Sequence, residues 1–129
     1  MIVLDSSAAT DLLLRLEPGP WVEERLLADA DVHAPHLLDV EVVSAISRLV
    51  RRRVIPLERG ADALADLPAL DVARYPHVPL LRRIWQLSST FTAYDAAFVA
   101  LADALGATLV TTDLRLARLA RSVIDVASP

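Results

Sequence analysis

The chain has 129 residues, no cysteine and no lysine, and its formal net charge is −4. This length is typical of one folding unit, so we expect a single domain over residues 1–129. The lack of cysteine excludes disulfides, zinc–thiolate sites and cysteine nucleophiles. The lack of lysine excludes Schiff-base chemistry and the lysine of phosphate-binding P-loops.

Apolar residues make up 54% of the chain, above the usual share of about 45–50%. We expect part of this excess to lie at an interface between chains rather than in a membrane. The most apolar stretch, 93–110, is interrupted by Asp95 and Asp103 and passes through Gly106, whereas a membrane-spanning helix needs about 20 nearly uncharged residues. No basic leader precedes the first apolar run. These features predict a soluble, cytoplasmic protein.

Apolar periodicity and turn residues predict the secondary structure in chain order. The expected elements are a strand at 1–4, helices at 8–14 and 21–28, a strand at 31–34, helices at 37–52 and 56–67, a strand at 70–73, helices at 80–87 and 94–105, a strand at 108–112, a helix at 114–120 and a strand at 123–126. Ser6 or Ser7 can cap the first helix, and Gly106 is placed to end the helix before it in a left-handed conformation. Alternating strands and helices indicate an α/β fold with a parallel sheet between helical layers.

Four acidic residues fall at corresponding places in this pattern. Asp5 and Asp113 each follow a predicted strand directly, and Glu41 and Asp95 lie near the starts of predicted helices. In an open parallel sheet, ligands bind beyond the carboxyl ends of the strands. A helix that follows such a strand begins at the same edge. We therefore expect the four carboxylates to converge there.

Convergent carboxylates favour a metal site. Like charges at short range raise one another's pKa or require a cation. Oxygen ligands without histidine or cysteine select Mg²⁺ or Mn²⁺, which retain water and leave room for phosphate. Such an ion activates water for hydrolysis and stabilises charge on a phosphodiester. Phosphodiester hydrolysis is the reaction that this set of residues suits best.

Three of the acids also have a purely structural interpretation. Asp5 and Asp113 could each be the N-cap of the helix that follows. Thr92 and Asp95 have the spacing of a capping box. Glu41 is harder to explain in this way, because it lies in a mostly apolar segment where an unpaired acid is costly.

Further residues were assigned around the four acids. The hydroxyls of Ser6 and Thr112 could orient a water or a phosphate, although helix capping is the simpler role for each. Arg115, two residues after Asp113, is a candidate for a phosphate contact because a guanidinium binds phosphate with two parallel bonds.

Other titratable residues are expected to have no catalytic part. Asp11 is placed on a solvated helix face. The three histidines, His33, His36 and His77, each lie beside or one residue from a proline and form no i, i+4 pair. We therefore expect them in surface or loop positions rather than at a metal.

Four segments of the chain, taken in order, match a known family. They are residues 2–7 (IVLDSS), 34–42 (APHLLDVEV), 94–102 (YDAAFVALA) and 106–113 (GATLVTTD). Each segment alone is weakly specific, but together they span most of the chain. In them the sequence resembles a PIN domain, and in particular the VapC-type toxins of bacterial toxin–antitoxin pairs.

The resemblance implies a three-layer α/β/α sandwich around a parallel sheet and a Mg²⁺- or Mn²⁺-dependent endoribonuclease. The family's acidic positions fall on Asp5, Glu41, Asp95 and Asp113. Asp5 and Asp95 are expected to be the most direct ligands, and Glu41 and Asp113 to complete the site. Thr112 is the expected hydroxyl helper. Water activated by the metal would give 5′-phosphate and 3′-hydroxyl ends.

The resemblance also implies partners: an RNA substrate, for which tRNA is one option, a second copy of the chain in a homodimer, and a cognate antitoxin. Without the four acids the formal charge is 0, so the low overall charge is compatible with a polyanionic substrate once cations are bound. Two alternatives were weighed. A Mg²⁺-binding receiver domain has a similar size, but it needs a lysine that this chain lacks. A non-catalytic PIN interaction module does not explain why all four acids are present.

Overall fold

The computed structural model describes residues 1–129 and is built on a sheet of five parallel strands. The strands are β1 (Ile2–Leu4), β2 (Val32–Pro35), β3 (Ala73–Tyr75), β4 (Thr108–Val110) and β5 (Val126–Ala127). They are arranged in the order β3–β2–β1–β4–β5, and every neighbouring pair is parallel. The chain thus proceeds outward from β1 on one side and returns to β4 on the other. The point where the strand order reverses lies between β1 and β4, which is where open α/β sheets bind ligands.

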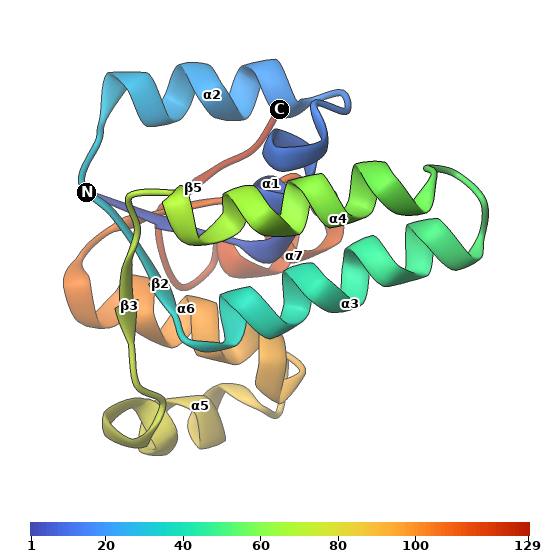
Figure 1. The fold of residues 1–129 in the computed structure, drawn as a ribbon. Coiled ribbons are helices and arrows are strands. Elements are labelled where there is room, and N and C mark those ends of the chain that lie inside the picture. Colours follow the sequence, from blue (N-terminus) through green and yellow to red (C-terminus); the bar gives the residue numbers. More distant parts are fainter.

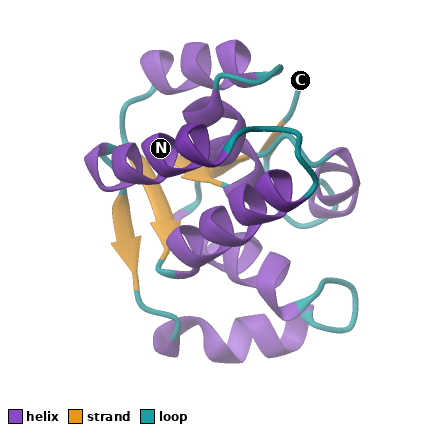
Figure 2. Cartoon of the chain, turned by 45° about the vertical axis from the view of Figure 1, so that its right-hand side comes forward, coloured by secondary structure: helices purple, strands orange, loops and turns teal.

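Helices cover both faces of this sheet (Figures 1 and 2). They are α1 (Ser6–Leu14), α2 (Gly19–Ala28), α3 (Leu37–Arg51), α4 (Leu57–Asp66), α5 (Leu81–Leu87), α6 (Ala93–Leu105) and α7 (Leu114–Ala120). Right-handed crossovers place α1 to α4 on one face and α5 to α7 on the other, because the chain changes direction across the sheet after β3. The α/β/α sandwich predicted from the sequence is therefore confirmed.

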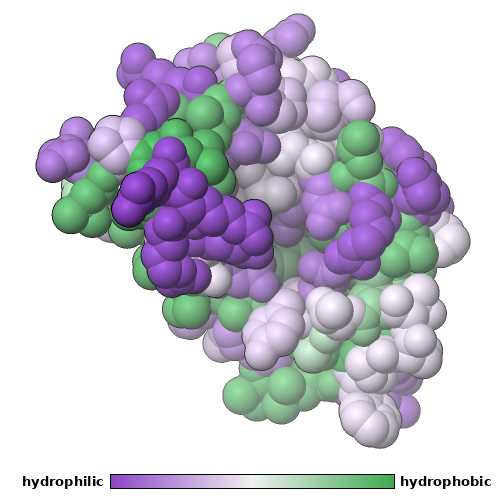
Figure 3. Space-filling view, turned by 90° about the vertical axis from the view of Figure 1, so that its right-hand side faces the viewer, coloured by the Kyte–Doolittle hydropathy of each residue, from purple (hydrophilic) through white to green (hydrophobic).

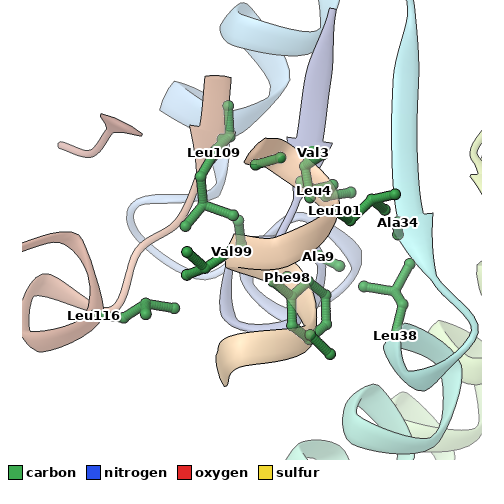
Figure 4. Packing of buried hydrophobic residues seen from close by; sticks show 14 of the residues in the cluster. Val3, Leu4, Ala9, Ala34, Leu38, Phe98, Val99, Leu101, Leu109 and Leu116 are labelled. Carbon is green, nitrogen blue, oxygen red and sulfur yellow. The ribbon is translucent and has the colours of Figure 1, made fainter. Parts of the chain in front are cut away.

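The core is densest around α6, whose residues Ala96 to Ala102 are all buried. Its side chains Phe98, Val99 and Leu101 pack among residues of the sheet and of neighbouring helices (Figure 4). On its other side α6 contacts α5. A helix enclosed in this way is apolar around most of its circumference. The packing of α6 fixes the position of its first turn, which carries Asp95.

The outer strand β3 does not lie where the sequence predicted it. The expected strand at 70–73 is wrong, because Leu67–Ala69 form a 3₁₀ turn and the pairing with β2 begins only at Ala73. The strand includes Arg74, a charged residue that apolar periodicity assigns to a loop. Its guanidinium binds the Asp39 carboxylate at 2.9 Å, and this neutralisation allows it at the sheet edge.

On the other side of β1, strand β4 is shorter than predicted, and strand β5 begins further along the chain than predicted. Strand β4 ends at Val110 rather than at residue 112. The predicted strand at 123–126 is also misplaced, because the chain continues in turns after α7, where the Val123 and Ile124 amides donate to the Ala120 carbonyl. Strand β5 is therefore only Val126–Ala127.

The long hairpin of α3 and α4 extends away from the sheet (Figure 1). Seen from its tip, the molecule presents hydrophilic side chains next to hydrophobic ones (Figure 3). Exposed arginines at 51–53 lie there beside exposed Val54 and Leu57. No helix of the structure has the length and the apolar character needed to cross a lipid bilayer.

Candidate active site

The four predicted acids all lie at the edge formed by the carboxyl ends of the strands. Asp5 follows β1 and is the N-cap of α1; Asp113 follows β4 by three residues and is the N-cap of α7. Asp95 lies in the first turn of α6, where its amide donates to the Thr92 hydroxyl. Glu41 is in the second turn of α3. The capping roles are thus real for Asp5 and Asp113, and they orient the side chains at this edge.

Asp5 is the most buried of the four, with 4% of its surface exposed. Its Oδ2 accepts hydrogen bonds from the hydroxyls of Ser7 at 2.5 Å and Thr111 at 2.8 Å. Burial raises the pKa of Asp5; these hydrogen bonds lower it, and the negative charge of Asp95 raises it further. No salt bridge neutralises this carboxylate. A cation bound at this edge would relieve that cost.

Glu41 is held by the residue next to Asp5. The Ser6 hydroxyl donates to Glu41 Oε2 at 2.6 Å. Burial raises the pKa of Glu41 and the Ser6 bond lowers it, while the charges of Asp5 and Asp95 raise it again. The negative charges of Asp5 and Asp95 therefore act on Glu41.

Asp95 and Asp113 are joined instead by an arginine. Arg115 Nη2 lies 2.8 Å from Asp95 Oδ2 and 3.7 Å from Asp113 Oδ2. The hydrogen bond to Asp95, followed by the charges of both acids, raises the pKa of the Arg115 guanidinium. The four acids therefore reach one edge as two groups that are linked through Asp95.

In this arrangement no group of three or more acidic or histidine side chains is placed so that it could together hold an ion. Arg115 instead contacts one oxygen of Asp95 and one of Asp113. The donor set itself consists only of carboxylate and hydroxyl oxygens, which suits a hard divalent cation. The chemistry of the donor atoms present thus fits such an ion.

The structure assigns the hydroxyl contact to Thr111 rather than to Thr112. Thr111 is fully buried, donates to Asp5 and accepts from the Asp113 amide at 3.1 Å. Both threonines lie beyond the end of β4 at Val110, and only the Thr111 hydroxyl contacts Asp5. The hydroxyl of Thr112, the residue expected in this role, contacts none of the four acids.

Thr112 faces the other way and contacts Asp11. Its hydroxyl donates to Asp11 Oδ2 at 2.6 Å. Burial raises the pKa of Asp11 and the Thr112 bond lowers it. The expectation that Asp11 lies on a solvated helix face is therefore wrong, because this carboxylate ties α1 to the loop that carries Asp113.

None of the histidines belongs to the acidic site, and only His33 is more buried than expected, since His36 is exposed and His77 lies in a loop. His33 is buried in β2, with Nδ1 2.9 Å from the Tyr75 hydroxyl and Nε2 2.9 Å from Asp31. Its expected surface or loop position is wrong. His77 Nε2 accepts from the Leu37 amide at the start of α3. The His33 ring thus joins the side chains of Asp31 and Tyr75, whereas His77 contacts the backbone of α3.

Comparison with known proteins gives this geometry a family. The model of the PIN domain matches residues 2–122. Ribonuclease VapC12 of Mycobacterium tuberculosis is 45% identical over 118 residues, which cover 92% of this chain and 91% of that protein. VapC ribonuclease Mb0985 of Mycobacterium bovis is 44% identical over 116 residues, covering 90% and 88% respectively.

Solved structures agree on the fold at much lower identity. PAE2754 from Pyrobaculum aerophilum superimposes with a TM-score of 0.68 at 22% identity, covering 96% of this chain and 82% of that one. VapBC2 from Rickettsia felis, bound to a DNA fragment from its promoter, gives a TM-score of 0.69 at 14% identity, covering 100% and 99%. On the family model and the similarity to VapC proteins together, the chain belongs to the PIN domain family and to its VapC members.

Proposed function

We propose that this protein is a divalent-metal-dependent endoribonuclease and the toxin of a toxin–antitoxin pair. The observation that carries the proposal is the placement of the four acids at one edge of the sheet, next to the switch point between β1 and β4. Relatives at 44–45% identity are named as ribonucleases, which supports RNA as the substrate.

Asp5 and Asp95 are the proposed direct ligands of Mg²⁺, with Mn²⁺ as a substitute, and Glu41 and Asp113 complete the site. When bound, such an ion would lower the pKa of a water molecule and stabilise negative charge on a phosphodiester. The protein's part is to hold the ligands. The hydroxyls of Ser7 and Thr111 both donate to Asp5 Oδ2. Neither of them contacts Oδ1, the other oxygen of this carboxylate.

Other side chains orient the rest of the site. Ser6 fixes Glu41 through a 2.6 Å hydrogen bond. The Arg115 and Leu116 amides donate to Asp113 Oδ1 at 2.9 and 3.0 Å, which anchors that carboxylate at the start of α7. Such supporting contacts decide how accurately ligands are placed. Thr112, in contrast, supports the loop through Asp11 rather than by contact with the acids.

The test is cleavage of total RNA with and without Mg²⁺, with the new ends mapped. We expect metal-dependent cuts with 5′-phosphate and 3′-hydroxyl ends, since metal-activated water does not need the ribose 2′-hydroxyl. Products with 2′,3′-cyclic phosphates would contradict the mechanism. The same map would show whether tRNA is the substrate.

The Asp95→Asn variant tests the site itself. We expect it to lose both Mn²⁺ binding and RNA cleavage. Asp103→Asn is a matched control, because Asp103 lies two turns later on α6 and pairs with Arg83 on the surface at 2.8 Å. Unchanged cleavage in Asp95→Asn would refute the proposed site.

We also propose a protein partner. Solved structures with this fold include FitAB bound to a DNA fragment and VapBC2 from Rickettsia felis bound to a promoter fragment, which supports a cognate antitoxin for this chain. Co-expression with the product of a short reading frame that directly precedes this one should give a stable complex without ribonuclease activity. Free, active toxin after co-expression would contradict this pairing.

A homodimer is the remaining proposed assembly. Leu81 and Trp85 of α5 and nearby Val78 are 54%, 79% and 76% exposed, and contiguous apolar surface of this kind commonly marks interfaces. The molar mass in solution, measured by light scattering, tests the proposal. A monomer at micromolar concentration would contradict it.

A further inference from the structure

Arg115 is bound twice to the loop that carries Asp113. Its amide donates to Asp113 Oδ1 at 2.9 Å, and its side chain folds back so that Nη2 lies 2.8 Å from Asp95 Oδ2 and 3.7 Å from Asp113 Oδ2. The guanidinium thus spans two carboxylates that come from α6 and α7. It is the only side-chain cation that forms a salt bridge with any of the four acids.

We propose that Arg115 is an intramolecular counter-ion that occupies the site in the metal-free protein and competes with the divalent cation for Asp95. This inference rests on the proposed function, since it takes Asp95 and Asp113 as metal ligands. A guanidinium and a metal ion cannot both be in contact with the same carboxylate oxygen. Binding of the ion therefore requires Arg115 to release Asp95 Oδ2, and the strength of this ion pair sets part of the apparent metal affinity.

Arg74 provides a comparison within the same protein, because its ion pair with Asp39 is supported by further hydrogen bonds. Arg74 binds Asp39 with two of its nitrogens and also donates to the carbonyls of Val72 and Leu67. Its side chain is 24% exposed. Arg115 has no carbonyl partner and is 59% exposed, so water can solvate its guanidinium as soon as it leaves Asp95.

Because its side chain is exposed, Arg115 can leave Asp95 at a small cost in free energy. Exposed ion pairs contribute little free energy because solvent screens them and the side chains lose conformational freedom. The ion pair between Arg115 and Asp95 is thus weak enough for a metal ion to displace it. The expected effect of its removal is a moderate change in affinity rather than a loss of the site.

The experiment is calorimetric titration of the metal-free protein with Mn²⁺ for the wild type, Arg115→Gln and Arg118→Gln. Arg118 is the matched control, because it is exposed, lies on the same helix α7 and forms no salt bridge. Its replacement removes the same charge without freeing a carboxylate. We expect Arg115→Gln to bind Mn²⁺ up to about fivefold more tightly than Arg118→Gln, the range that an exposed ion pair allows. The difference should shrink as salt is added.

Thermal unfolding gives a second readout that does not depend on activity. Without metal, Arg115→Gln should melt at a lower temperature than Arg118→Gln, because the repulsion between Asp95 and Asp113 is no longer offset. Mn²⁺ should raise its melting temperature by more than that of the control. Equal Mn²⁺ affinity in the two variants, or weaker binding by Arg115→Gln, would overturn the inference and leave the proposed function standing. A wild-type protein that binds no Mn²⁺ would overturn the metal site and the inference with it.

Discussion

The two halves of the acidic site keep negative charge in place by different means. Asp5 and Glu41 are held by neutral hydroxyls on α1 and directly after β4, and burial raises the pKa of both. The side chains of Asp95 and Asp113 are 19% and 37% exposed, and the two acids share Arg115. The buried half is rigid but electrostatically costly, whereas the half that shares Arg115 is neutralised but can rearrange. A divalent cation would bind Asp5 and Glu41 as they are held in this structure, and it would replace Arg115 at Asp95 and Asp113.

The largest effect should come from Asp5, on which the buried half depends. In Asp5→Asn, the amide oxygen can still accept from Ser7 and Thr111, but the charge is gone. We expect cleavage to fall by at least about 100-fold, because charge stabilisation by a bound metal amounts to several kcal/mol. The metal-free variant should nevertheless melt at a higher temperature than the wild type, since an uncompensated buried charge has been removed.

Measuring cleavage and thermal unfolding on the same preparation separates the two effects. Glu41→Gln should show the same pair of changes to a smaller extent, because Glu41 is less buried than Asp5. If Asp5→Asn is less stable than the metal-free wild type, the buried carboxylate is not under electrostatic strain and the contrast between the two halves fails.

The next effect distinguishes the two threonines. Thr111→Val removes the hydroxyl that bridges Asp5 and the Asp113 amide, and it leaves these polar groups without that partner in a buried place. We expect a loss of about 1–3 kcal/mol in the free energy of unfolding and a fall in cleavage of about 10–100-fold, as for other groups that orient metal ligands.

Thr112→Val is the matched control, with the same change one residue later. It breaks only the bond to Asp11, so cleavage should fall much less than in Thr111→Val. Chemical denaturation and initial cleavage rates measure both quantities. Equal losses in the two variants would mean that the loop as a whole, and not the Thr111 hydroxyl, positions Asp5.

The acids and threonines of the site also show which features could be predicted from the sequence. The four acids were identifiable because each stands at a strand end or a helix start, and a parallel sheet brings such positions together. The choice between Thr111 and Thr112 depends on where β4 ends, which is a matter of one residue. Asp11 was misassigned because its partner, Thr112, is 101 positions away in the sequence.

The edge strands were misplaced for a related reason. Strands β3 and β5 have three and two residues, too few for an apolar period to define their bounds. Arg74 of β3 pairs with Asp39 of α3, a contact between distant residues that apolar periodicity does not reveal. The contacts of Arg115 with Asp95 and Asp113 could not be predicted from the sequence either, because they depend on the distance between α6 and α7. The sequence predicted which groups meet; it could not predict which of them pair.

The pH dependence of stability gives a smaller effect that reports on the buried half alone. The pKa values of Asp5 and Glu41 are raised in the folded protein above the ordinary values of 3.8 and 4.5. Well below those values both states are protonated and this contribution to stability is fully present. As the pH rises, the unfolded chain releases its protons first, so the metal-free protein loses stability until the raised pKa values have been passed.

Other carboxylates also make stability depend on pH: the pKa of Asp11 is raised by burial, and that of Asp29 is lowered by the N-terminal amine. Comparing the melting temperatures of Asp5→Asn and the wild type at each pH isolates the contribution of Asp5. The difference in melting temperature between variant and wild type should grow from pH 3.8 upward and then level off. Mn²⁺ should reduce the difference at neutral pH. A difference that does not depend on pH would mean that Asp5 has the same pKa in both states.

The smallest effect should come from Ser6, which contacts the buried half without bearing any of its charge. Ser6→Ala removes the hydrogen bond to Glu41 but leaves Ser7 and Thr111 on Asp5. Because Glu41 is only half-buried and water can replace the lost donor, we expect a cost of about 1 kcal/mol, or about fivefold in cleavage. Ser44→Ala, on the exposed side of α3, should leave cleavage unchanged. If Ser6→Ala instead matches Asp5→Asn, Glu41 is a ligand as direct as Asp5, and the ranking of the four acids must change.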